Sequence, residues 1–401
     1  MKKVKDVFGD DIYLNDISRI EKNEPWKNWG SMPEVVIGTK QNYKSFAFEF
    51  ESEDDIEYFK ELTGLPINES SKFINLPLRP RVDRISKAYV HDNSKCDISE
   101  VLPKYPIFLP SKGRWDHRFT SNALIEQGIK HYMVVEKSQY EEYKRCVDPN
   151  WVTLLILPQE YLDNYDTCDD LGFQKSKGPG AARNFAWDYA IELGAKYHWV
   201  MDDNLNTFYR YNYDNRHYCK SPAMWRAMED HTERYSNMYM SGPQYRGFVV
   251  PGQVTKPFTT NTRVYSCNLI KNDIPFRWRG RYNEDTDLSL NILKAGFCTA
   301  QYYAFIVGKL KTQAVPGGNT AEFYAKEGTM PKSKMLVDMH PDVAKVCWKF
   351  SRWHHEVDYT PFKNNKLILN PGYENIADEV NNYGMHYIDI NTGEEISHED
   401  E

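Results

Sequence analysis

The chain lacks several features that would assign it to a class at once. It has no Cys-x-x-Cys pair, and its 7 cysteines are scattered over 401 residues, which favours reduced thiols over a disulfide framework or a zinc site. No apolar run approaches the roughly eighteen residues of a membrane helix, and the charged N-terminal sequence lacks a signal-peptide core. A formal net charge of −7 means that DNA binding would have to rest on a local basic patch. These absences predict a cytoplasmic protein without a membrane span.

The middle of the chain has a clear alternation of strand and helix patterns. Four apolar segments predict strands: "YPIFLP", "HYMVVE", "WVTLLILP" and "YHWVM". Helical patterns lie between them, the last from Ala181 to Leu193 with Gly194 as its stop. Such alternation predicts right-handed crossovers and a mainly parallel sheet. Ligands bind at the carboxyl ends of strands in such sheets, and the loops "PSKGR", "VEKS" and "MDDN" all follow strands.

The flanking segments predict smaller units. Alternating phenylalanines around Phe46 predict a strand, and Ser52 and Gly64 are typical of the two ends of a following helix. We therefore expect an N-terminal α+β module with a linker over residues 1–100, a catalytic domain over 101–360 and a C-terminal extension over 361–401.

Two adjacent aspartates, Asp202 and Asp203, leave the last predicted strand. Neighbouring side chains on an extended segment point to opposite sides, so one can hold Mg²⁺ or Mn²⁺ while the other binds a ribose or sugar hydroxyl. We assign Asp203 to the metal and Asp202 to the donor, although the pattern does not decide which aspartate has which role. A plain solvated turn is the alternative for an isolated Asp-Asp-Asn.

A glycine-containing turn, "KGPGAARN", precedes the helix at Ala181. Gly178 and Gly180 allow close backbone approach, and a helix N-terminus favours anions. Lys177 and Arg183 add positive charge for a phosphate. The turn fits neither a Walker A sequence nor Gly-x-Gly-x-x-Gly, and an ordinary loop is the alternative reading.

An acid and base cluster occupies "RWRGRYNEDTDLSLNILKAG". Its carboxylates are Glu284, Asp285 and Asp287, and its preceding cations are Arg277, Arg279 and Arg281. Carboxylates at a helix start can be simple caps. With the arginines beside them, a carboxylate could instead deprotonate an acceptor hydroxyl while the arginines hold phosphates.

Two later segments add candidates. In "KFSRWHHEVDY", His354 and His355 with Arg352 could complete a site for a metal and a pyrophosphate, although a surface pair is the commoner reading. The loop around Gly317, Gly318 and Asn319 is typical of a flap that orders over a ligand.

Together these motifs resemble the GT-A nucleotide-sugar glycosyltransferases. More narrowly, "GPGAARNFAWDYAIELGAKYHWVMDDN", "YNEDTDLSLNILKAGF", "GGNT" and "RWHHEVDY" resemble the TET-associated glycosyltransferase family of phages, from about Pro106 to Tyr359. The resemblance implies an α/β fold of the GT-A (Rossmann-like) type, with a mainly parallel sheet flanked by helices. It also implies a divalent metal, held by a loop that here reads Asp-Asp-Asn in place of Asp-x-Asp.

The resemblance further implies that the acceptor is phage DNA containing 5-hydroxymethylcytosine and that Asp285 of the "ED" element faces the acceptor hydroxyl, with Glu284 as fallback. We expect a UDP-sugar donor at Pro110, Ser111, Lys112, Arg114 and Glu136. The three arginines would contact DNA phosphates, and Trp278, Tyr282 or Trp353 would stack on a displaced base.

The sequence leaves other readings open. A GT-A transferase could act on a protein, glycan or lipid, and the chain could be an inactive module that binds modified DNA. A nucleotidyltransferase is less favoured. Its glycine-rich loop should directly follow the first strand, but the loop at that position, "PSKGR", is poor in glycine. No residue separates arabinose from glucose as the transferred sugar, or retention from inversion, and the oligomeric state is undetermined.

Overall fold

The computed structural model describes residues 3–5, 11–13, 24–38, 48–68, 71, 74, 86–169, 178–310, 330–349 and 352–397. Most of the strand predicted around Phe46 lies outside these residues, as do Lys177 and the predicted flap at Gly317, Gly318 and Asn319.

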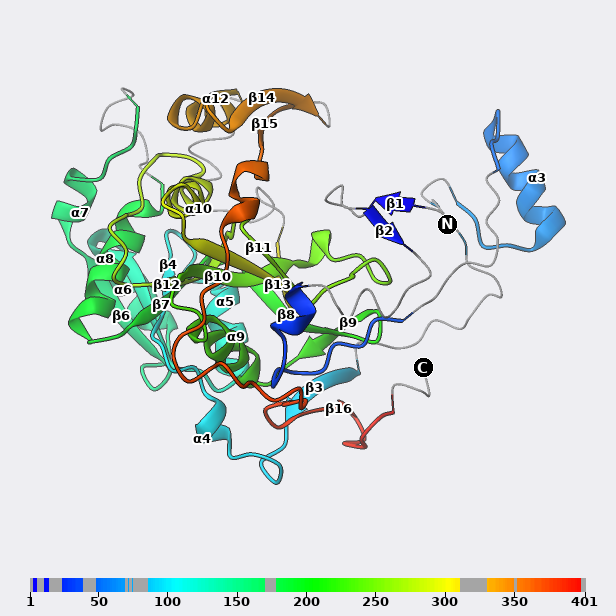
Figure 1. Ribbon diagram of the computed structural model, residues 1–401, viewed down its shortest axis with the longest axis horizontal. Helices are drawn as coiled ribbons and strands as arrows, with labels where there is room; N and C mark the ends of the chain where they lie inside the picture. Colours follow the sequence, from blue (N-terminus) through cyan, green and yellow to red (C-terminus); the bar gives the residue numbers. More distant parts are fainter. Residues whose placement is uncertain are drawn as a thin grey trace.

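A twelve-stranded sheet, counted over the described residues, forms the centre of the molecule (Figure 1). Its order is β16-β3-β9-β8-β13-β10-β12-β7-β4-β5-β6, and β11 pairs with β13 outside this path. The strands are β3 (Lys87–His91), β4 (Ile107–Pro110), β5 (His131–Glu136), β6 (Val152–Leu157), β7 (Tyr197–Met201), β8 (Leu205–Asn212), β9 (Asn215–Cys219), β10 (Met238–Tyr245), β11 (Phe258–Thr260), β12 (Cys267–Lys271), β13 (Cys298–Lys309) and β16 (Met385–Asp389).

The four strands predicted from the sequence are β4, β5, β6 and β7, and they form a parallel block. The rest of the sheet is mixed. β12 runs antiparallel to both of its neighbours, β7 and β10, whereas β10 and β13 are parallel. The predicted α/β fold class of the GT-A type is confirmed, and its antiparallel strands extend the sheet beyond the Rossmann-like block.

Helices cover both faces of this sheet. The main ones are α5 (Phe119–Glu126), α6 (Tyr140–Cys146), α8 (Gly180–Glu192), α9 (Ala223–Glu233) and α10 (Glu284–Lys294), and the shorter ones are α2 (Glu24–Lys27), α4 (Ile98–Val101), α7 (Gln159–Asp163) and the 3₁₀ turns η1 (Lys137–Gln139), η2 (Arg246–Phe248) and η4 (Thr360–Asn364). Side chains of α5, α6 and α9 share one apolar cluster, and those of α8 and α10 share another. In the part of the chain that the structure describes, no helix is long and apolar enough to cross a bilayer.

Segments from both ends of the chain join the same body. Trp29, Met32 and Val35 are buried in the larger apolar cluster, and β3 pairs with β16 at one edge of the sheet. The helix α3 (Glu53–Thr63) stands apart from this body (Figure 1). It has the predicted ends, with the Ser52 hydroxyl accepting from the Asp55 amide at 3.2 Å and Gly64 left-handed at φ +68°. The hairpin β1 (Lys3–Lys5) and β2 (Asp11–Tyr13) precedes it.

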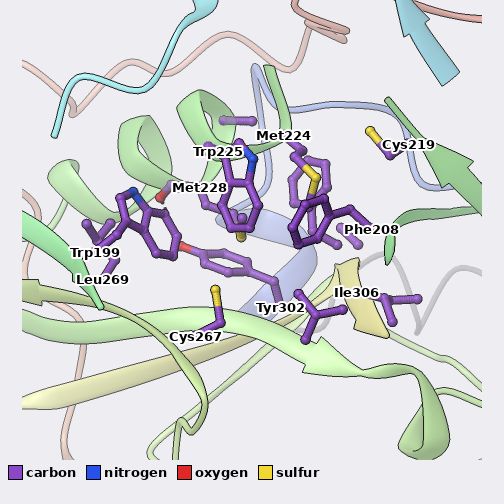
Figure 2. Close-up of a cluster of buried hydrophobic side chains, with 14 of the residues drawn as sticks. Trp199, Phe208, Cys219, Met224, Trp225, Met228, Cys267, Leu269, Tyr302 and Ile306 are labelled. Carbon is purple, nitrogen blue, oxygen red and sulfur yellow. Dashed lines mark hydrogen bonds between the residues drawn. The ribbon is translucent and has the colours of Figure 1, made fainter. Parts of the chain in front are cut away.

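Three aromatic rings organise the packing of α9 against the sheet (Figure 2). Trp225 meets Trp199 edge-on at 5.2 Å and Phe208 at 5.0 Å between ring centroids. Both indole N–H groups have buried acceptors: Trp225 donates to Gln127 at 2.7 Å, and Trp199 donates to Glu229 at 2.8 Å. The rings therefore pack tightly without leaving a buried donor unsatisfied.

This packing predicts a large difference between two tryptophan substitutions. Trp225→Ala removes a fully buried side chain and should lower the free energy of unfolding by about 3–5 kcal/mol. Trp348→Ala, at a side chain that is 59% exposed, should change it by less than about 1 kcal/mol. Urea unfolding of the two variants measures both free energies. Equal losses would contradict the conclusion that Trp225 of α9 packs in the core.

Candidate functional site

The two aspartates after β7 face different partners, as expected for neighbours on an extended segment. One carboxylate oxygen of Asp202 accepts from Arg183 at 2.8 Å, and the other accepts from the Lys309 ammonium at 2.7 Å. Lys309 is the last residue of β13, and it also donates to the hydroxyls of Ser266 at 2.9 Å and Tyr245 at 3.1 Å. Asp202 therefore joins three elements that are distant in sequence.

These cations decide the charge state of Asp202. Burial alone would raise the pKa of this carboxyl, but the charges of Lys309 and Arg183 outweigh it and hold the pKa well below its usual range. Asp202 is thus an anion at neutral pH although only 22% of its side chain is exposed.

Asp203 turns toward the loop after β4. The Ser111 hydroxyl donates to one of its oxygens at 2.7 Å, and Arg114 makes an ion pair with the other. The same serine hydroxyl lies 2.7 Å from the hydroxyl of Tyr143. Burial raises the pKa of Asp203, and Arg114 opposes that rise.

The three loops predicted to converge do so. Lys112 forms an ion pair with Glu136 at 3.2 Å, and the amide of Gly113 donates to Gln139 at 2.8 Å. Pro110 ends β4 opposite Val134 of β5. "PSKGR", "VEKS" and "MDDN" therefore form one surface at the carboxyl ends of β4, β5 and β7, where a nucleotide can bind.

The turn before α8 differs from the predicted phosphate cradle. A Cβ atom on Gly180 would overlap the Tyr165 ring, and one on Gly178 would lie 2.9 Å from the Arg281 carbonyl oxygen. Both glycines are therefore required by packing within the protein. Arg183 is almost fully buried, and its anions are carboxylates of the protein itself.

The start of α10 carries the predicted catalytic carboxylates. Glu284 is buried and accepts from Arg183 at 3.0 Å. Burial raises its pKa to about 7, although Arg183 opposes this. Asp285 is half-buried, and one of its oxygens accepts from the Thr286 amide at 2.9 Å. Arg183 thus connects the strand-end aspartate Asp202 to the helix that presents Asp285.

Asp287 has a structural environment. It is fully buried, and its carboxylate accepts from both Nε and a terminal nitrogen of Arg279 at 3.1 Å, from His340 at 2.7 Å and from Asn291 at 3.1 Å. All its acceptor positions therefore serve the packing of α10. The catalytic role of Asp287 stays a prediction, and these contacts favour a structural role for it.

The three arginines before α10 also differ from the expectation of free phosphate contacts. The side chain of Arg281 has no exposed surface and pairs with Asp169 at 2.7 Å and 2.9 Å. Arg279 pairs with Asp287, and Arg277 lies over the Trp187 ring and 3.5 Å from Asp188. Arg281 cannot reach DNA without breaking a buried pair, and the other two expose 41% of their side chains.

The predicted histidine pair lies on a separate hairpin. β15 (Arg352–Val357) pairs with β14 (Ala344–Lys349), and Arg352 donates to the His354 ring at 3.0 Å. Burial, aided by the charges of Arg263 and Lys332, lowers the pKa of His355 to about 4. Among the described residues, the His355 Nδ1 atom is buried without a hydrogen-bond partner.

The expected metal set of Asp203, His354 and His355 is not formed. Over the described residues, no three His, Cys, Asp or Glu side chains come together as a metal site. Both carboxylates of the Asp-Asp-Asn loop are already paired with Arg or Lys, and a divalent ion would have to displace these cations. The donor set of the loop therefore does not fit a divalent ion in this arrangement.

Two cations of the site were missed by the sequence reading. Lys309 closes a twelve-residue, almost fully buried strand, and the partly buried Arg263 lies over the Tyr265 ring at 4.8 Å. Neither lies in a motif. An isolated lysine directly after the apolar run "YYAFIVG" was the available signal for Lys309.

The Asp202 ion pairs predict a pH-dependent loss of stability in Asp202→Asn. Because its folded pKa is lowered, the carboxylate stabilises the fold above the unfolded pKa of about 4 and loses this effect as pH falls further. We expect Asp202→Asn to lower the free energy of unfolding by about 2–3 kcal/mol at pH 7. This is somewhat less than the cost of breaking a fully buried ion pair, because a fifth of the Asp202 side chain is exposed. Urea unfolding near pH 7 and pH 3 measures the difference from wild type. A difference that does not shrink at low pH would contradict the ion-pair explanation.

The comparison with protein families agrees with the motifs. The family described as TET-Associated Glycosyltransferase matches residues 105–318, just over half of the chain. This range contains the parallel block, both loop aspartates and the start of α10. No curated protein matches the chain. The chain belongs to the TET-associated glycosyltransferase family.

Proposed function

We propose that this protein transfers a sugar from a UDP-sugar to the hydroxymethyl group of 5-hydroxymethylcytosine in DNA, in the cytoplasm of a phage-infected host. One observation carries the proposal. Arg183 binds Asp202 of the strand-end loop and Glu284 of α10 at the same time, and it thereby places a donor surface next to the carboxylates proposed for the acceptor.

The donor half uses the surface formed by "PSKGR", "VEKS" and "MDDN". Lys112, Arg114 and Glu136 offer hydrogen bonds to a nucleoside. Lys309, with 21% of its side chain exposed, lies on the other side of the loop to meet a diphosphate. Negative charge grows on the UDP leaving group as the glycosidic bond breaks. Fixed cations beside it stabilise that charge in the transition state.

The acceptor half uses Asp285. A primary alcohol is a weak nucleophile until its proton is drawn off, and a positioned carboxylate can accept this proton. Asp285 is half-buried at the mouth of α10, whereas Glu284 is engaged with Arg183. Asp287 holds α10 in place through Arg279 and His340 and does not itself contact the acceptor.

Transfer to a non-DNA acceptor is the competing function. Mass spectrometry of nucleosides from hydroxymethylated DNA, incubated with the enzyme and a panel of UDP- and GDP-sugars, decides between them. A mass gain of one pentose or one hexose on the modified cytidine supports the proposal and names arabinose-type or glucose-type transfer. Donor hydrolysis that never depends on DNA would contradict it.

The paired carboxylates predict that UDP binds without an added divalent ion. We expect calorimetric Kd values in EDTA and in Mn²⁺ to agree within about threefold, roughly 0.65 kcal/mol. Lys309→Met should weaken UDP binding by at least about tenfold, because it removes a partly buried cation from the proposed diphosphate position.

Two controls accompany this measurement. Lys309→Arg keeps the charge and should retain most of the affinity, and Lys334→Met changes a lysine that is 65% exposed and should have no effect. Binding that requires Mn²⁺ would show that a metal displaces the cations from the loop aspartates.

The proposed base predicts a selective loss of turnover. Asp285→Asn keeps the size of the side chain but cannot take a proton, so transfer should fall by about 10²–10⁴-fold. UDP and DNA affinities should stay within roughly threefold. Single-turnover assays and calorimetry measure the two effects separately.

Glu284→Gln is the matched control at the neighbouring position. Near-normal turnover in both variants would remove the base assignment and indicate a retaining mechanism, in which the departing phosphate can take the proton.

A further inference from the structure

A hairpin packs beside the helix that presents Asp285. β14 and β15, with α12 (Met330–Met339), lie over α10 (Figure 1). The apolar contact joins Leu290, Leu293, Leu336 and Phe362 with the base of the hairpin. Two polar contacts add to it: His340 binds Asp287 at 2.7 Å, and the Asn283 amide donates to the Lys332 carbonyl oxygen at 2.7 Å. The hairpin is therefore held in a fixed position relative to the start of α10.

The register of the hairpin divides its side chains between two faces. On one face the cross-strand pairs are Ala344 with Val357, Val346 with His355, and Trp348 with Trp353. This face begins at Ala344, in the apolar cluster that it shares with Leu290 and Leu293 of α10. One face of the hairpin thus runs outward from the helix that presents Asp285.

That face ends in two exposed tryptophans. Trp348 is 59% exposed and Trp353 is 40% exposed, and their rings meet edge-on at 5.1 Å. The other aromatic residues expected to stack on a base, Trp278 and Tyr282, are buried. An exposed indole pair on a rigid hairpin is unfavourable in water unless a partner covers it.

The surroundings of the tryptophans carry positive charge in an acidic protein. α12, β14 and β15 together contain five Lys or Arg side chains and two carboxylates, whereas the whole chain has a net charge of −7. Lys349 and Arg352 form the next cross-strand pair, so their side chains lie on the opposite face of the hairpin from the tryptophans. Lys349 pairs there with Glu356 at 3.2 Å, and Arg352 donates to the His354 ring at 3.0 Å. A surface that combines flat aromatic rings with cations fits a nucleic acid, whose bases stack and whose phosphates are anionic.

We propose that the β14–β15 hairpin is the DNA-contacting element of this enzyme, with Trp348 and Trp353 stacking on bases from one face and Arg352 contacting a phosphate from the opposite face. This inference rests on the proposed function, because it assigns the surface that brings DNA to Asp285. It takes the place of Arg279 and Arg281 before α10, which pair with Asp287 and Asp169.

Fluorescence anisotropy with a labelled duplex containing 5-hydroxymethylcytosine tests the proposal. Trp353→Ala should weaken binding by about five- to hundredfold, as expected for the loss of a stacked aromatic ring, and Trp353→Phe should recover part of it. Arg352→Ala should lower the slope of log K against log salt by about one, since one phosphate contact is lost. UDP affinity and urea unfolding should match the wild type for all three variants.

Arg277→Ala is the matched control, because it removes another exposed arginine, from the loop before α10. Wild-type affinity and salt slope in the hairpin variants, or a loss confined to Arg277→Ala, would overturn the proposal and leave the glycosyltransferase function intact. A wild-type protein that transfers sugar but binds no DNA would overturn the proposed acceptor and the hairpin assignment together. Sedimentation velocity completes the test: a wild-type dimer that Trp353→Ala dissociates would assign the tryptophans to self-association.

Discussion

The buried guanidinium of Arg183 is the constraint on which the site depends. Its side chain is 3% exposed and lies between Asp202 and Glu284, with the Trp278 ring 4.6 Å from its centre. A charge with so little water around it must be paired, since an unpaired buried ion destabilises a fold by several kcal/mol. The pairing requires the end of β7 and the start of α10 to be in the same place. Lys309 extends the same requirement to the end of β13.

A second layer of pairs supports the first. The Tyr165 hydroxyl donates to the Gly280 carbonyl oxygen at 2.8 Å and lies against Gly180, so the turn into α8 and the loop into α10 pack directly together. Arg281 with Asp169, and Arg279 with Asp287, hold the same loop. The basic cluster therefore acts as scaffold, and the residues left for substrates are those at its edge, such as Asp285.

The sequence was a good guide where local pattern determines structure. The strands β4 to β7 and the helices between them were predictable, because buried parallel strands are continuous apolar runs and helices have their own period. The edge strand β16 and its neighbour β3 were not predictable, because they pair across about 300 positions of sequence and neither carries an internal signal for that partner. The family and the convergence of three loops could be predicted. The binding partners of Arg183, Arg279 and Arg281 could not be predicted. The sequence pattern of a basic residue near an acidic cluster is the same whether its side chain binds a phosphate or a carboxylate.

The balance of charge also bears on how the proposed donor enters. Asp202 and Asp203 are already paired with Arg183, Lys309 and Arg114, so an arriving diphosphate shares cations that are in use. Glu284 shares Arg183, and burial has already raised its pKa. Glu284 and Asp202 hold Arg183 within the fold, which leaves Lys309, 21% exposed, as a cation that the diphosphate can reach. Asp285, one residue further along α10, is half-buried and is proposed to take the acceptor proton. In the proposed reaction, the adjacent carboxylates thus divide their roles by environment: Glu284 keeps Arg183 paired within the fold, and Asp285 serves the acceptor.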